Sequence, residues 1–74
     1  MTDLLATTGE LAGKVWRHLA ALGKQSLRDV ALALETDSVR LAIAVGWLAR
    51  EDKIALRKVD STIIVALKEN TESW

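Results

Sequence analysis

The segment from Ser38 to Ile54, SVRLAIAVGWLAREDKI, constrains the fold more than any other part of the chain. Apolar residues recur in it at the spacing of one helical face, at Leu41, Ala44, Val45 and Leu48. Thr36 or Asp37 can cap such a helix, because a side-chain oxygen before the first turn accepts a hydrogen bond from a free backbone N–H group. The segment therefore predicts an α-helix from Ser38 to Glu51.

A longer helix is predicted near the start of the chain. Thr7 followed by Glu10 has the pattern of a capping box, which predicts that the helix begins there, and Gly23 supplies the glycine that commonly ends one. Its apolar stripe is Leu11, Val15, Leu19 and Leu22, with Trp16 beside them.

A short helix is predicted between these two. Ser26 followed by Asp29 is an N-cap signal, and the apolar stripe after it is Leu27, Val30, Ala31 and Leu34. Lys24 and Gln25 connect it to the first helix, with room for a minimal strand.

The segments Ile54–Lys58 and Thr62–Lys68 are rich in β-branched residues and leucine, and residues 59–61 between them predict a turn. Together they predict a β-hairpin with one buried face. That face would hold Ile54, Leu56, Ile63, Val65 and Leu67. A lone hairpin is unstable in water, so we expect this one to pack on the helices.

Helix, short strand, helix, helix and hairpin is the order of a winged helix-turn-helix domain, whose wing is the hairpin. The 74 residues make one α+β domain over residues 1–74, with its core between about residues 8 and 68 and a polar tail over residues 69–74. The tail ends in Trp74, and neither its role nor that of the N-terminal residues follows from the sequence. There is no cysteine, so no disulfide or thiolate metal site supports this small core.

The predicted third helix is apolar on a second face as well. That face holds Val39, Ile43, Gly46, Trp47 and Arg50. A helix with two apolar faces is usually buried on both, and a mid-helix glycine, which costs about 1 kcal/mol relative to alanine, favours close approach of another element. We therefore expect a homodimer interface across a two-fold axis. The alternative is that Trp47 belongs to the core of the monomer.

Two motifs resemble a known family. GKVW (Gly13 to Trp16) and GWLAREDKI (Gly46 to Ile54) are similar to segments of small bacterial and archaeal winged helix-turn-helix proteins that form a domain family of unknown function. The resemblance covers about Thr8 to Leu67, and it implies the winged-helix fold but no catalytic or ligand-binding residue. Asp52 stands where a glycine often closes the third helix in that family.

The residue types that carry catalysis are scarce. His18 is the only histidine, and without cysteine most pairs of nucleophile and base are missing. Glu51 and Asp52 are adjacent, and neighbouring residues on a helix point in different directions, so two convergent carboxylates are not expected. We predict a solvated His18 and a non-catalytic protein without cofactor, bound metal or small-molecule ligand.

DNA binding is the alternative function, as in transcription regulators that contact DNA through the wing and the third helix. The residues for such contacts would be Arg40, Arg50, Lys53, Arg57 and Lys58. Base readout needs polar side chains at several helix positions, and Arg40 and Arg50 are the only candidates there. A formal net charge of +0 also gives no long-range attraction to DNA. Lysines on an edge hairpin have a second interpretation, as a guard against edge pairing.

Trp16 and Trp47 lie in leucine-rich helical stripes, so we interpret them as packing residues, with base stacking as the alternative. No apolar run approaches the ~20 residues of a membrane span, and a cytoplasmic location is the expectation.

Overall fold

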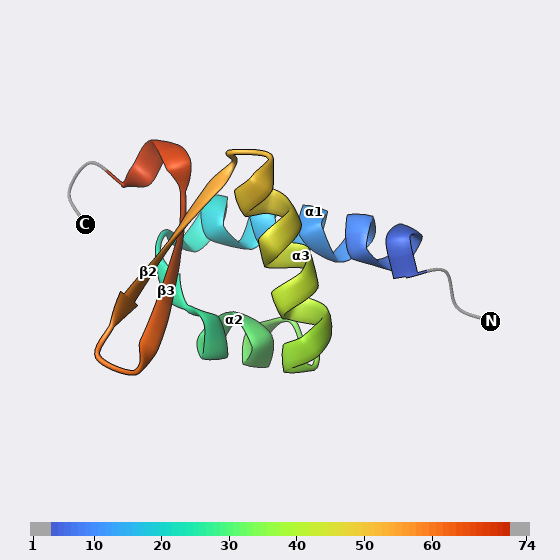
Figure 1. The fold of residues 1–74 in the computed structure, drawn as a ribbon, viewed down its shortest axis with the longest axis horizontal. Helices are drawn as coiled ribbons and strands as arrows, with labels where there is room; N and C mark the ends of the chain where they lie inside the picture. Colours follow the sequence, from blue (N-terminus) through green and yellow to red (C-terminus); the bar gives the residue numbers. More distant parts are fainter. Residues whose placement is uncertain (1–3, 72–74) are drawn as a thin grey trace.

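The structure is a computed structural model in which residues 4–71 are described. The helices are α1 (Leu4–Leu22), α2 (Leu27–Ala33) and α3 (Ser38–Arg50), the strands are β1 (Gln25–Ser26), β2 (Ile54–Val59) and β3 (Thr62–Leu67), and a 3₁₀ helix, η1 (Lys68–Asn70), follows. The predicted order of elements is confirmed. In Figure 1, α1 runs along the long axis of the molecule, α3 crosses it, and the hairpin lies beside the helices.

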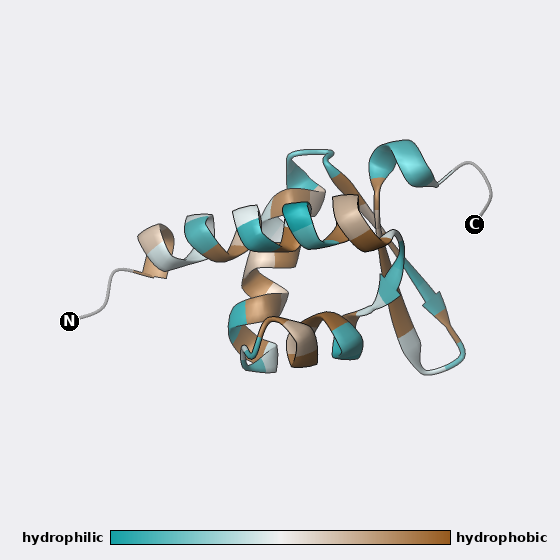
Figure 2. Ribbon diagram, turned by 180° about the vertical axis from the view of Figure 1, so that it is seen from behind, coloured by the Kyte–Doolittle hydropathy of each residue, from teal (hydrophilic) through white to brown (hydrophobic). Residues whose placement is uncertain are grey.

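The core forms where the three helices meet the base of the hairpin. Its largest fully buried side chains are Val15 and Leu19 of α1, Val30 of α2, Leu41 of α3 and Val65 of β3. The predicted inner face of α3 lies in this core, since Leu41, Ala44, Val45 and Leu48 are all buried. The hydropathy colouring shows α3 as largely hydrophobic along its length, behind a more polar α1 (Figure 2).

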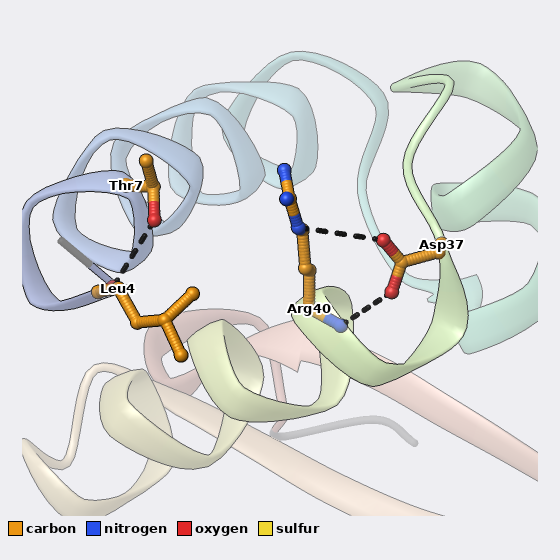
Figure 3. A network of polar contacts seen from close by, with 4 residues as sticks. All are labelled: Leu4, Thr7, Asp37 and Arg40. Atoms are coloured by element: carbon orange, nitrogen blue, oxygen red, sulfur yellow. Dashed lines mark hydrogen bonds and ion pairs between the residues drawn. The ribbon is translucent and has the colours of Figure 1, made fainter. Parts of the chain in front are cut away.

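The start of α1 differs from the prediction. The helix begins at Leu4, and Thr7 lies within it, where its hydroxyl donates to the carbonyl of Leu4 at 3.2 Å (Figure 3). A threonine inside the first turns cannot be the N-cap, because the cap residue lies outside the helix. The pattern of Thr7 and Glu10 therefore imitates a capping box, and the helix begins three residues before Thr7.

The other helix ends follow the predicted signals. Gly23 has a φ of 79°, and its N–H donates to the carbonyl of Leu19 at 2.8 Å. The Ser26 hydroxyl accepts from the N–H of Asp29 at 3.0 Å and so caps α2. Of the two candidate caps of α3, Asp37 is the one used, and its Oδ1 accepts from the N–H of Arg40 at 2.8 Å.

The end of α3 lies at Arg50, one residue before the predicted end, with Glu51 as its C-cap. Asp52 follows with a φ of 60°, the left-handed region in which glycine is usual. Its N–H donates to the carbonyl of Ala49, and the N–H of Lys53 donates to that of Leu48, each at 3.0 Å. These two bonds make a Schellman motif, which Asp52 closes at the position where glycine is usual.

The strands form an antiparallel sheet in the order β1-β3-β2. The hairpin differs from the prediction in three respects. Val59 belongs to β2 and pairs with Thr62, so the loop is only Asp60 and Ser61. Strand β3 ends at Leu67, and Lys68 begins η1. The predicted buried face is buried at Ile54, Val65 and Leu67, whereas Leu56 on the edge strand β2 and Ile63 near the loop are nearly half exposed.

Candidate interaction surface

The outer face of α3 lies on the protein surface. Val39 is largely exposed, the exposed fractions of Ile43 and Trp47 are 46% and 37%, and Gly46 and Arg50 are exposed too. Trp47 is not part of the buried core, so the alternative that assigned it to the monomer core is wrong. All five residues predicted for a dimer interface are therefore accessible to a partner.

Gly46 has no packing role that the described chain accounts for. A Cβ atom built at this position would meet no heavy atom within 4 Å. Glycine in the middle of a helix lowers stability by about 1 kcal/mol relative to alanine. The backbone of α3 is therefore open to close approach from outside, and nothing among residues 4–71 uses that access.

Trp47 forms a ridge between two grooves on this side of the molecule. Its indole Nε1 donates to Oε1 of Glu51 at 2.9 Å, which holds the ring along the helix. The first groove is called here the tryptophan groove. Its apolar lining is Gly9, Ala12, Gly13 and Trp16 of α1, Trp47 and Leu48 of α3, and Leu67 of β3, and its charged lining is Arg17, Glu51, Lys53, Lys68 and Glu69. The second, called the helical groove, is lined by Leu5 and Thr8 of α1, by Ile43, Gly46, Trp47 and Arg50 of α3, and by Glu51.

Helix α1 thus contributes to the same surface, which the sequence interpretation missed. Trp16 was interpreted as a packing residue, and 42% of it is exposed, as one wall of the tryptophan groove. Leu5, at the other end of this surface, is 72% exposed. Leu5, Gly9 and Trp16 recur at steps of four and seven residues, the spacing of one helical face, and that periodicity was the available signal.

The five candidate nucleic-acid contacts do not form one cluster. Arg40 and Arg50 are ten residues apart on α3, which separates their backbones by about 15 Å. The Nε atom of Arg40 also lies 3.5 Å from Oδ2 of Asp37, so its charge is partly offset at the start of α3 (Figure 3). Arg57 and Lys58 are consecutive in β2, and successive strand residues point to opposite faces of the hairpin. Lys53 lies before that strand, and all five are exposed.

The candidate catalytic residue types have other partners. His18 is partly buried rather than solvated, and its Nε2 lies 2.7 Å from Oε1 of Gln25, linking α1 to β1. Glu51 bonds Trp47, whereas Oδ1 of Asp52 pairs with Nζ of Lys68 at 3.1 Å, so the adjacent acids diverge as predicted. Within residues 4–71, no three His, Asp or Glu side chains converge in a group that could hold a metal ion.

None of the helices in the described part of the chain is both long and apolar enough to cross a membrane. Trp74, whose role the sequence left open, lies outside the described residues, as do the first three residues of the chain.

Comparisons with known proteins agree with the fold. Residues 1–67 match the family described as winged helix-turn-helix domain (DUF2582). The chain is 38% identical over 71 residues to the uncharacterized protein MJ1608 of Methanocaldococcus jannaschii, covering 92% of this chain and 100% of that protein. It also resembles the solution NMR structure of protein BT2368 from Bacteroides thetaiotaomicron, with a TM-score of 0.77 and 31% identity, over 90% of this chain and 83% of that one. The fold and family predicted from the sequence are confirmed, and the chain belongs to the DUF2582 family of winged helix-turn-helix domains of unknown function.

Proposed function

We propose that this domain is a non-catalytic interaction module that forms a homodimer through the outer face of α3. The observation that carries the proposal is the exposure of Ile43, Trp47 and Val39 on a helix whose opposite face is core. A two-fold interface uses each residue twice, so a short apolar face on one helix becomes a larger self-complementary patch.

The magnitudes give at most a weak dimer if α3 acts alone. Full burial of an aliphatic or aromatic side chain contributes about 1.5–3 kcal/mol, and these three are already partly covered, so each adds roughly 1 kcal/mol. Counted in both copies, the gain is on the order of 6 kcal/mol, near the low end of the 4–15 kcal/mol that association costs. Additional contacts are needed for a tight complex.

The non-catalytic part of the proposal rests on the residue types. His18 is the only histidine of the chain, and its imidazole is engaged with Gln25. Glu51 is held by the indole of Trp47, which leaves it poorly placed as a general base.

DNA binding is the second candidate, supported by the fold and by the exposure of Arg50, Lys53, Arg57 and Lys58. The two candidates compete for one surface. Major-groove insertion would use the outer face of α3, so a dimer formed through that face excludes it. Only contacts from the wing would then remain.

The test replaces Ile43 with arginine and measures molar mass by size-exclusion chromatography with light scattering. A charged side chain at the centre of the patch cannot be desolvated at an apolar interface, so we expect the wild type to be a dimer and Ile43→Arg a monomer. Leu32→Arg is the matched control, since Leu32 is an exposed apolar residue on α2, and it should stay dimeric.

The DNA alternative is tested with the same proteins and a labelled duplex at low and rising salt. The homodimer proposal predicts no salt-sensitive binding. An Ile43→Arg protein with wild-type molar mass would contradict the homodimer, and binding that weakens steeply with salt would support DNA contact instead.

A further inference from the structure

Helix α1 extends past the helix on which it packs. With 19 residues it is about 28 Å long, whereas the 13 residues of α3 span about 20 Å. In Figure 1 the N-terminal turns of α1 project beyond α3, at the end of the molecule away from the wing. Leu4 and Leu5 both lie in this projecting part and are more than half exposed.

The outer face of α3 is too small to form a stable interface by itself. A helix of this length and about 10 Å width presents a face of roughly 200 Å². Specific dimers bury about 800 Å² on each partner, and weak ones roughly 500 Å². A homodimer through α3 must therefore extend over a neighbouring element.

The neighbouring element on the apolar side is α1. Leu5 lines the helical groove together with Ile43, Gly46 and Trp47, so the projecting turns of α1 are continuous with the proposed interface. Gly46 leaves the α3 backbone open in the same groove. A leucine side chain from outside can reach the helix backbone there, which a larger residue would prevent.

We propose that the N-terminal turns of α1 extend the homodimer interface, so that Leu5 of each copy packs against Ile43 and Gly46 of the second copy. This reciprocal contact rests on the proposed homodimer and adds to it. The helical groove is then completed by residues of the second copy. This arrangement gives both the exposed Leu5 and the open glycine a role.

Leucines at the two ends of α1 provide a matched comparison. Leu22 is 61% exposed, close to the 72% of Leu5, but it lies at the other end of the helix and lines neither groove. We expect Leu5→Asp to weaken dimerisation at least tenfold and Leu22→Asp to change it less than about threefold. An aspartate near the N-terminus of a helix is favourable, so loss of the dimer in Leu5→Asp would not reflect loss of the helix; circular dichroism checks this.

Crosslinking tests the contact directly, because the chain has no cysteine. A tagged Ile43→Cys chain is mixed with untagged Leu5→Cys or Leu22→Cys, and the mixed pairs are joined with a short thiol-specific crosslinker. Each chain carries one thiol, so every mixed product is between subunits. We expect the tagged chain to crosslink to Leu5→Cys and not to Leu22→Cys.

The outcomes separate the reciprocal contact from the homodimer itself. If Ile43→Arg is monomeric, Leu5→Asp dimerises like wild type and Leu5→Cys crosslinks no better than Leu22→Cys, the reciprocal contact is wrong and the homodimer stands. A wild-type monomer overturns both.

Discussion

The two faces of α3 carry similar side chains and have opposite environments. Leu41 and Val45 on the inner face are buried by α1, α2 and the base of the wing. Ile43 and Val39 on the outer face are as apolar but lie at the surface. Apolar character therefore does not determine which face of a helix the monomer buries, and the second face is the one that we propose as a homodimer interface.

The wing repeats this contrast on a smaller scale. Ile54, Val65 and Leu67 on one face of the hairpin are buried, whereas Leu56 and Ile63 on the same face are nearly half exposed. In α3 and in the hairpin, the periodicity of the sequence correctly identifies which residues share a face. Whether that face is buried depends on which neighbouring elements reach it.

The largest expected effect is on the inner face. Leu41→Ala removes a fully buried side chain and leaves a cavity, so it should lower the free energy of unfolding by about 2–5 kcal/mol. Ile43→Ala, on the outer face, should change monomer stability by less than about 1 kcal/mol. Urea unfolding of both variants at low protein concentration measures this, because dimerisation adds concentration-dependent stability. Equal losses would show that the two faces do not differ as described.

The next largest effect on unfolding is expected at the N-terminus of α3, the helix that carries both faces. Asp37→Ala removes the N-cap of α3 and should cost about 1 kcal/mol in thermal or urea unfolding. The exposed ion pair with Arg40 adds little to this. Thr36→Ala is the control, since that residue was the other candidate cap and should cost much less. A larger loss for Thr36→Ala would mean that the cap is misassigned.

The smallest expected effect is that of Gly46→Ala, which should change monomer stability and dimer association in opposite directions. Gly46→Ala should stabilise the monomer by up to about 1 kcal/mol, because a Cβ there has open space and alanine favours the helix. The same methyl group should weaken association if a partner approaches the backbone at this point. Unfolding is measured in the Ile43→Arg background, and association in the wild-type background. A variant that is both more stable and more strongly dimeric would contradict a close contact at Gly46.

The sequence predicted the type and order of the helices and strands better than the residues at which they begin and end. Gly23, Ser26 and Asp37 each carry a cap whose chemistry is local, and each occurs where expected. The start of α1 was wrong because Thr7 can bond within a helix as readily as cap one. Asp52 closes α3 through its left-handed backbone, which an aspartate tolerates, so the missing glycine was no obstacle.

The candidate surface was only half predicted. The residues on the outer face of α3 follow from helical periodicity, and the structure places all five at the surface. The contribution of α1 depends on the length by which it exceeds α3 and on how the two helices cross. Periodicity can place Leu5 and Trp16 on one face of α1, but only the tertiary structure shows that this face borders the outer face of α3.

Sedimentation equilibrium of the wild-type chain over a wide range of concentrations tests the central claim most directly. We predict a reversible shift from the 8.1 kDa monomer to a dimer of twice that mass as the concentration rises, with Ile43→Arg remaining monomeric throughout. A wild-type chain that stays at the monomer mass at every concentration would contradict the claim that the outer face of α3 is a homodimer interface.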